Sequence, residues 1–168
     1  MKTLVKKLCV VSILLTAGNF LNAQLYLGPG GGLDYGGLGG KIEYLPVKYL
    51  GVSGGFGYNF LYVGWNVGVN GKIRTGDRVQ LSPTVLYGYN GVFSGEGNYP
   101  SMVSYGVSAG FNIDIAARKA GNKWSIGFFY PFRTSEFLDY CDTIRRDSSM
   151  GIFVLLPITI SVGYNFRL

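Results

Sequence analysis

Apolar and polar residues alternate along most of the chain, with the period of a β-strand, in which successive side chains point to opposite faces. The clearest run extends from Ile158 to Leu168. Its even-numbered residues are aliphatic or aromatic, whereas its odd-numbered residues are small or polar. We therefore predict a strand here that has one apolar face and one polar face.

Seven earlier stretches show the same alternation, and turn-forming residues separate them. We predict these strands near residues 25–35, 38–45, 50–58, 61–74, 79–90, 103–115 and 124–132, with the last strand beginning near Gly151. In the first, Leu33 and Tyr35 share the face of Leu25 and Leu27. Pro83 has no N–H to donate, so we expect a bulge or a local gap in the ladder there. The two longest connections, residues 91–102 and 133–150, are expected to be irregular.

Eight strands joined mainly by short connections predict an all-β fold, an eight-stranded antiparallel up-and-down barrel with both termini on the same side. Most of these strands have the 9 to 11 residues that a tilted strand needs to cross a bilayer. An apolar face toward lipid and a small or polar face toward a narrow interior is the arrangement of a transmembrane barrel. A soluble periplasmic barrel that binds an apolar ligand is the alternative, because alternation alone does not say which face is wet.

The first residues have the organisation of a secretory signal peptide. Lys2, Lys6 and Lys7 precede an apolar run from Leu8 to Leu15, and Leu21-Asn22-Ala23 then offers a small residue before Gln24. We predict cleavage after Ala23, which leaves residues 24–168 as one barrel domain. A transmembrane anchor is the alternative, but the run is shorter than the roughly 20 residues that span a bilayer as a helix.

Composition and charge argue against several classes of function. Three of the 15 Lys and Arg lie in the signal segment, so 12 remain against 9 Asp and Glu, a formal charge of +3. No basic run remains to indicate nucleic-acid binding. The chain contains no histidine, which removes the commonest general base and the commonest metal ligand. We therefore expect no enzyme activity and no catalytic, cofactor or metal site.

The end of the chain carries a second pattern, Ser161-x-Gly163-x-x-Phe166-x-Leu168. It resembles the C-terminal assembly signal of Gram-negative outer-membrane β-barrels. Together with the export signal and the eight strands, it makes the chain similar to the small OmpX/OmpA-type eight-stranded barrels. That resemblance implies an outer-membrane location, contact with outer-membrane lipid, and insertion by the barrel assembly machinery. It implies architecture and location far better than activity.

Aromatic residues gather toward the predicted strand ends, as expected for two girdles at the water–lipid boundaries. Tyr44 and Trp124 belong to the predicted inner girdle, and Tyr87 and Tyr130 belong to the outer one. Trp65 falls in the middle of its predicted strand and is expected in neither girdle.

Charges of both signs fall on the predicted interior face of the barrel. Because buried charges must pair or reach water, we expect a salt-bridged plug. A proton- or ion-conducting path is the alternative, although eight strands leave an interior that side chains fill. The residues concerned are Asp34, Lys41, Glu43, Lys72, Arg74, Asp114 and Arg167.

The connection 133–150 is the longest and mixes charged residues with apolar anchors. It is expected either to bind an extracellular protein partner or, our preferred interpretation, to fold as a cap over the barrel mouth. Cys141 is the only cysteine after the signal segment, either a free thiol or a link between two molecules. The contact candidates are Phe137, Tyr140, Cys141, Arg145 and Arg146. The predicted function is thus that of an integral outer-membrane protein with a structural or surface-interaction role.

Overall fold

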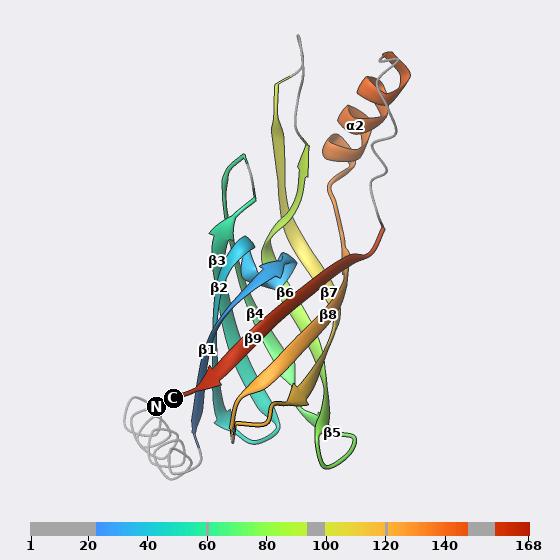
Figure 1. Cartoon of the computed structure of the whole chain (residues 1–168). Helices are drawn as coiled ribbons and strands as arrows, with labels where there is room; N and C mark the ends of the chain where they lie inside the picture. The colour runs from blue at the N-terminus through green and yellow to red at the C-terminus, as the bar shows by residue number, and fades with distance from the viewer. Residues whose placement is uncertain (1–22, 60, 94–99, 120, 148–156) are drawn as a thin grey trace, which may run out of the picture.

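The computed structural model describes residues 23–59, 61–93, 100–119, 121–147 and 157–168. Their strands form one closed barrel (Figure 1). Residues 1–22 of the predicted signal segment and the expected start of the last strand at Gly151 lie outside the described residues. The strands are β1 (Gln24–Gly32), β2 (Gly37–Val47), β3 (Leu50–Tyr58), β4 (Val63–Gly71), β5 (Ile73–Arg74), β6 (Val79–Phe93), β7 (Met102–Ala116), β8 (Lys123–Pro131) and β9 (Thr159–Arg167).

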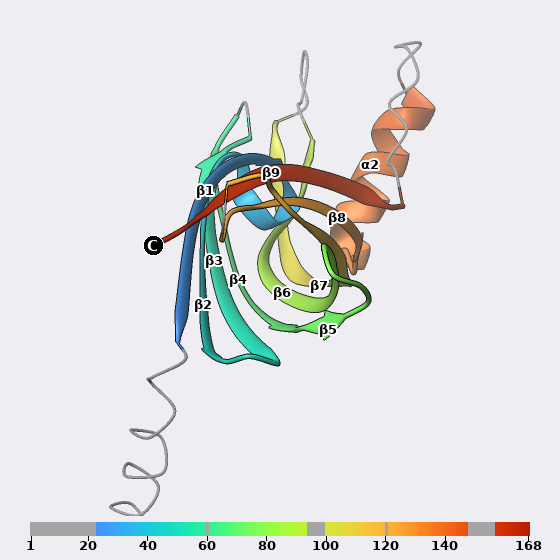
Figure 2. The same ribbon diagram turned by 60° about the horizontal axis from the view of Figure 1, so that its bottom comes forward.

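The barrel wall contains eight strands, as predicted. The two-residue β5 continues β4 after Lys72, and both pair with β6. Each of the remaining strands pairs antiparallel with the strands next to it in sequence. The first and last strands also pair with each other, with Leu27 of β1 opposite Phe166 of β9. The pairing of β4 with β6 completes the ring (Figure 2). The fold is therefore an all-β, eight-stranded antiparallel closed barrel.

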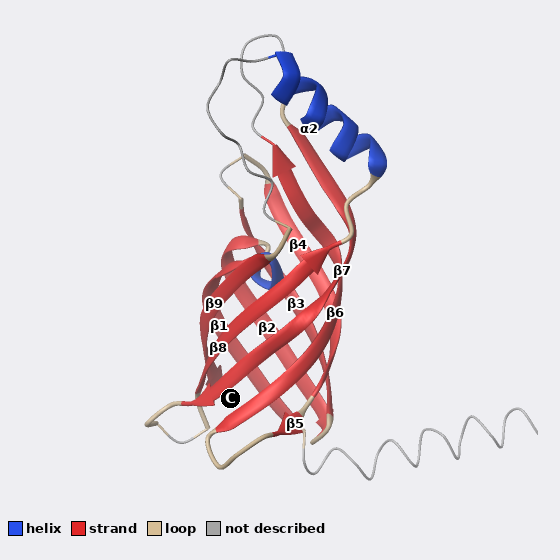
Figure 3. Ribbon diagram, turned by 90° about the vertical axis from the view of Figure 1, so that its right-hand side faces the viewer, coloured by secondary structure: helices blue, strands red, loops and turns tan. Residues whose placement is uncertain are grey.

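The two ends of the barrel differ. The turns that follow β2, β5 and β7 lie at one end together with the end of β9, and we call this the short-turn end (Figure 1). The longer connections after β6 and β8 lie at the opposite end, the long-loop end (Figure 3). The strand ends that flank the two longest connections therefore lie at the same end of the barrel.

The alternation of apolar and polar residues follows the two faces of the wall. On β4, Val67 and Val69 are about half exposed on the outside, whereas Asn66 and Asn70 are buried inside. On β9, Ile160 is exposed, while Ser161 is buried. Apolar side chains therefore face outward and polar side chains face the interior. None of the helices in the described ranges is long and apolar enough to cross a membrane.

The first strand ends earlier than predicted. At Gly32 (φ 127°) the chain leaves the wall and forms the 3-10 helix η2 (Leu33–Tyr35) inside the barrel. Leu33 and Tyr35, predicted on the same face as Leu25 and Leu27, are instead buried in the interior. The predicted assignment was wrong because the inward turn ends the strand's alternation. Gly36 (φ 72°) then returns the chain to the wall, in a left-handed conformation that favours glycine.

Glycines in the neighbouring strands make room for η2. A Cβ atom on Gly55 of β3 would overlap the backbone of Asp34, and one on Gly64 of β4 would overlap the backbone of Gly36. On the opposite wall, a Cβ on Gly163 of β9 would overlap the hydroxyl of Tyr35. The glycine-rich composition thus provides space inside a narrow barrel.

Pro83 lies at a gap in the hydrogen-bond ladder, as predicted. Pairing of β4 with β6 ends at Asn70 opposite Thr84, and pairing resumes between β5 and β6 at Ile73 opposite Leu81. Toward β7 the register runs through Pro83 without a shift. The missing N–H therefore faces the interruption between β4 and β5.

Strands β6 and β7 project beyond the barrel as a hairpin, and the helix α2 (Ser135–Asp147) packs against it (Figures 1 and 3). The prediction of an irregular segment at 133–150 was wrong over α2. Phe137, Cys141 and Ile144 recur at helical spacing, and all three are buried in a cluster with Phe93 of the hairpin. We call the β6–β7 extension (residues 89–93 and 102–107) together with α2 the hairpin–helix protrusion.

Candidate functional site

Four charged side chains meet inside the barrel toward the short-turn end, and we call them the four-charge cluster. They are Glu43 of β2, Lys72 between β4 and β5, Asp114 of β7 and Lys123 of β8. Each lysine nitrogen lies 2.5 Å from a Glu43 carboxylate oxygen, and 3.0 Å (Lys72) or 2.9 Å (Lys123) from Asp114 Oδ2. Two positive charges therefore balance two negative charges inside the barrel.

Hydroxyl groups complete the coordination of Asp114. Ser125 Oγ donates to Asp114 Oδ1 at 2.5 Å, and Ser82 Oγ donates to Oδ2 at 3.1 Å. All four charged residues of the cluster are buried. A buried ion pair must be fully hydrogen-bonded to offset the loss of hydration. The cluster meets this requirement and links strands on several sides of the barrel.

A second ion pair fixes the inward-folded helix η2. Lys41 Nζ donates to Asp34 Oδ2 at 2.6 Å and lies 4.7 Å from the centroid of the Tyr35 ring. Asn66 Nδ2 donates to the Leu33 carbonyl at 2.5 Å. These contacts satisfy polar groups of η2 that would otherwise be buried without partners. They attach η2 to the inner wall as a plug.

Toward the long-loop end the interior contains an apolar cluster. Leu33 of η2, Leu86 of β6 and Phe129 of β8 form a buried cluster, and Tyr89 packs against it. The interior thus contains three successive groups of side chains, namely the four-charge cluster, the Asp34–Lys41 pair and this apolar layer. An eight-stranded barrel has an interior that side chains can fill, and here they occupy it from both ends.

The structure places the predicted interior charges in two different environments. Asp34, Lys41, Glu43, Lys72 and Asp114 are buried in the interior and form ion pairs with one another or with Lys123. Arg74 and Arg167, in contrast, are exposed at the short-turn end. Each is the last residue of its strand. Because the wall ends there, the side chain reaches solvent at the rim and does not enter the interior.

Sequence reasoning missed Lys123, which it assigned to the polar turn before β8. The sequence nevertheless indicated that Lys123 faces inward, because Lys123, Ser125, Gly127 and Phe129 alternate with the outward-facing residues and so share one face of the strand. Lys123 and Ser125 are both buried and both contact Asp114. Extending the alternation by one residue would have placed Lys123 inside.

The contact candidates of the segment 133–150 are divided between the core and the surface of the protrusion. Phe137 (0% exposed) and Cys141 (6%) are buried, so they attach α2 to the hairpin. Tyr140 is partly exposed, and its hydroxyl donates to the Pro100 carbonyl at 2.6 Å. Arg145 and Arg146 lie in the last turns of α2, and their side chains are outside the described part of the structure.

Cys141 is a free thiol in the core of the protrusion. Burial raises the pKa of this thiol, the positive charge of Arg133 opposes that shift, and Asp142 adds to it. Because the thiolate is the reactive form, we expect Cys141 to react more slowly in the folded protrusion than in an exposed segment.

Two pairs of outward-facing aromatic residues lie near opposite ends of the barrel. Trp65 packs against Tyr105 with ring centroids 5.9 Å apart, toward the long-loop end. Trp124 packs against Tyr164 at 4.8 Å, toward the short-turn end. The prediction that Trp65 lies in mid-strand was wrong, because β4 begins only at Val63. The two tryptophans of the chain therefore mark opposite ends of the wall.

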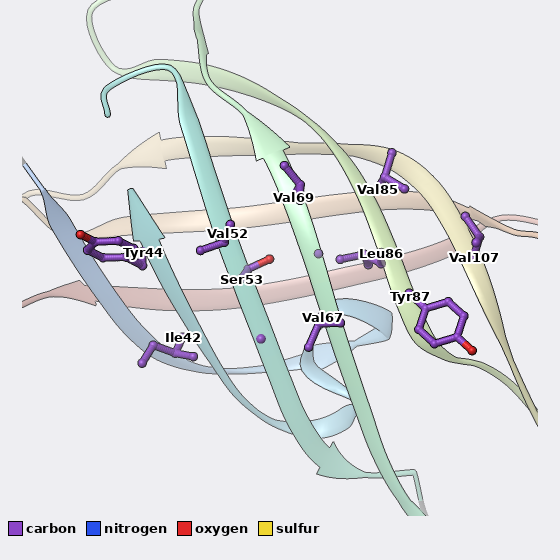
Figure 4. A pocket seen from close by; sticks show the side chains of 12 residues that line it. Ile42, Tyr44, Val52, Ser53, Val67, Val69, Val85, Leu86, Tyr87 and Val107 are labelled. Carbon is purple, nitrogen blue, oxygen red and sulfur yellow. The ribbon is translucent and has the colours of Figure 1, made fainter. Parts of the chain in front are cut away.

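A hollow of about 620 Å³ lies along the wall across β2, β3, β4, β6 and β7 (Figure 4). It contains no charged side chain, and its only polar side-chain groups are hydroxyls. It therefore lacks an acid–base pair. Within the described residues, no group of three or more His, Cys, Asp or Glu is placed to hold a metal ion. The lining residues are Ile42, Tyr44, Val52, Ser53, Gly54, Val67, Gly68, Val69, Val85, Leu86, Tyr87 and Val107.

Comparison of the chain with protein-family models, with curated proteins and with solved structures finds no match. The function must therefore be inferred from the barrel and its side chains.

Proposed function

We propose that this chain is an integral outer-membrane protein whose barrel wall spans the lipid bilayer and whose hairpin–helix protrusion provides a contact surface outside the cell. The single observation that carries the proposal is the distribution of polarity. Exposed aliphatic and aromatic side chains encircle the barrel, whereas the ion pairs lie inside it. Soluble proteins rarely expose contiguous apolar surface beyond a few hundred Å².

The height of the apolar belt supports a transmembrane position. Along β4 and β5 the exposed apolar residues extend from Val63 to Ile73. Ten residue steps of about 3.3 Å correspond to about 33 Å along the strand. At a tilt of about 40° this becomes about 25 Å along the barrel axis, the height of the apolar band of outer-membrane barrels.

The two alternative functions fit the interior less well. A soluble barrel that binds an apolar ligand needs an apolar interior, but Asn66, Asn70 and the four-charge cluster occupy this one. An ion-conducting barrel needs a continuous wet path, whereas η2 and the apolar layer around Phe129 fill the interior toward the long-loop end. The proposed role is therefore structural, with interaction through the protrusion.

The proposal includes export by residues 1–23 and insertion by the barrel assembly machinery through the C-terminal pattern. Within that pattern, Phe166 and Leu168 are exposed, and Ser161 is buried. Gly163 has a second role, because it leaves the space that the Tyr35 hydroxyl occupies.

The test is expression of the full-length chain in a Gram-negative host, followed by membrane fractionation and gel mobility with and without boiling. We expect the chain in the urea-washed outer-membrane fraction, with a mobility that changes on heating. Val67→Lys places a charge on the middle of the belt, which costs about 2–4 kcal/mol in lipid. Leu138→Lys on the exposed face of α2 is the matched control and is expected to assemble normally. Recovery of both variants as stable soluble periplasmic proteins would overturn the proposal.

A further inference from the structure

Exposed basic side chains gather at the short-turn end of the barrel. Six of them, against the single carboxylate of Asp77, lie in the three turns or at strand ends there: Lys48, Arg74, Arg78, Arg118, Lys119 and Arg167. Within the described residues, none of the six forms an ion pair with a carboxylate. This end therefore has an unbalanced positive charge.

These cations are spread around the rim and do not line a cleft. They lie in the turn between β2 and β3, at the connection from β5 to β6, in the turn between β7 and β8, and at the end of β9. In the order of strands around the barrel, these four positions recur at intervals along the circumference. We call the six residues the basic ring.

Apolar side chains of the belt adjoin the basic ring. Lys48 Nζ lies 4.7 Å from the centroid of the Tyr49 ring. Arg74 follows the exposed Ile73, and Arg167 lies between the exposed residues Phe166 and Leu168. Long basic side chains at such a boundary keep their stems on apolar surface and their charged ends in the headgroup region.

The described charges of the opposite end include exposed carboxylates, with Arg133 half-buried beside them. On α2, the carboxylates of Glu136, Asp139 and Asp142 are exposed. The fully exposed charges that the structure describes are therefore mainly positive at the short-turn end and negative on α2, and we expect the stronger attraction to anions at the short-turn end.

We infer that the basic ring binds the anionic headgroups of lipids in the leaflet at the short-turn end. The inference rests on the proposed transmembrane position of the wall. Phosphate oxygens accept charge-assisted hydrogen bonds from guanidinium and ammonium groups. A headgroup layer surrounds a transmembrane barrel completely, so cations distributed around the rim match it better than they match a ligand bound in one cleft.

Trp124 provides a reporter at this site. It is half exposed on the wall and follows the turn that contains Arg118 and Lys119. The same turn contacts the end of β9, because the backbone N–H of Arg167 donates to Asn122 Oδ1 at 3.2 Å. The chain has two tryptophans, so Trp65→Phe leaves Trp124 as the only one.

The experiment measures quenching of Trp124 fluorescence in the Trp65→Phe protein, reconstituted in phosphatidylcholine vesicles. Phosphatidylcholine or phosphatidylglycerol with brominated acyl chains is added in increasing proportion. We expect phosphatidylglycerol to be favoured about fivefold, the ratio for one favourable contact between a cation and an anionic headgroup. In 1 M salt the preference is expected to fall toward unity. In the Trp124→Phe protein, Trp65 at the other end is expected to show no preference.

Charge variants locate the effect. The triple variant Arg118→Gln, Lys119→Gln, Arg167→Gln is expected to lose the preference, whereas Glu136→Gln, Asp139→Asn, Asp142→Asn on α2 is the control and keeps it. Equal quenching by both lipids in the Trp65→Phe protein would overturn the inference and leave the proposed function intact. Absence of quenching by either lipid at both tryptophans would overturn the proposed function itself.

Discussion

Replacement of Asp114 by asparagine tests the four-charge cluster. In the folded barrel the Asp114 carboxylate accepts hydrogen bonds from Lys72 Nζ at 3.0 Å and from Lys123 Nζ at 2.9 Å. The substitution keeps the shape of the side chain and removes its charge. Two buried lysines then face the single carboxylate of Glu43, and one positive charge has no counter-charge.

The expected loss of stability is large because the cluster is buried. Removing one partner of a buried ion pair costs about 3–5 kcal/mol, since the remaining charge stays out of water. Asp139→Asn on the exposed face of α2 is the matched control, and it is expected to change the free energy of unfolding by less than about 0.5 kcal/mol. The two variants remove the same charge from a buried and an exposed site.

A compensating variant separates charge balance from packing. Lys72→Met in the Asp114→Asn background leaves one lysine and one glutamate in the cluster, so the interior is again neutral. Because buried ion pairs can be replaced by apolar residues with little loss of stability, the double variant is expected to be more stable than Asp114→Asn alone. The coupling between the two substitutions is expected to exceed about 1 kcal/mol.

The assay is equilibrium unfolding in urea of the barrel reconstituted in vesicles, followed by tryptophan fluorescence and by gel mobility. The midpoint is expected to fall for Asp114→Asn with an unchanged slope, which indicates a change in stability without a change in the surface exposed. The reasoning would be refuted if Asp114→Asn lay within 1 kcal/mol of the unmodified protein, or if the double variant lost the sum of the two single losses.

Two further variants test the plug and the protrusion. Gly36→Ala is expected to cost about 1–3 kcal/mol, because Gly36 has φ 72° and a Cβ there would overlap the backbone of Gly64. Gly76→Ala, where a Cβ meets no atom within 4 Å, is its control in the same unfolding assay, and equal stability of the two would contradict the account of η2. Cys141 is expected to react with a maleimide about tenfold more slowly in the folded protein than in the unfolded one, since burial raises the pKa of the thiol and restricts access to it. Phe137→Ala is expected to accelerate that reaction and Leu138→Ala to leave it unchanged, whereas labelling of the native protein at the unfolded rate would show that α2 does not pack on the hairpin.

The wall of the barrel was predictable from the sequence because apolar and polar residues alternate along each strand. On β4, four alternating residues from Val63 to Val69 face outward, whereas Asn66 and Asn70 face inward. The gap at Pro83 was also predictable, since a residue without an N–H cannot donate a hydrogen bond to the neighbouring strand and leaves a bulge or a gap in the ladder. Local chemistry determined both features.

The interior was less predictable, because there the chain departs from the wall. Leu33 and Tyr35 continue the alternation of β1 in sequence but lie in η2, and the turn at Gly32 depends on space that glycines of distant strands provide. Lys123 was missed for a different reason, since a lysine next to a turn is usually solvated. Only the carboxylates of β2 and β7 make its burial favourable.

The helix α2 was missed although its sequence contains the signal. Phe137, Cys141 and Ile144 have the spacing of one helical face. The segment was nevertheless predicted to be irregular, because charged residues lie between these three and strands were predicted on both sides. The partner of that face, Phe93, belongs to a hairpin that extends beyond the barrel. The turn residues of the sequence alone do not indicate that β6 and β7 continue beyond the barrel.

The central claim is that the outer face of the wall contacts lipid, and one tryptophan in the middle of the belt tests it most directly. Val67 is outward-facing and 53% exposed, so Val67→Trp in a chain that also carries Trp65→Phe and Trp124→Phe places the only tryptophan there. In vesicles of phosphatidylcholine brominated near the middle of its acyl chains, we predict strong quenching of this tryptophan and little quenching by iodide in the water phase. Quenching by iodide with no response to the brominated lipid would contradict the account.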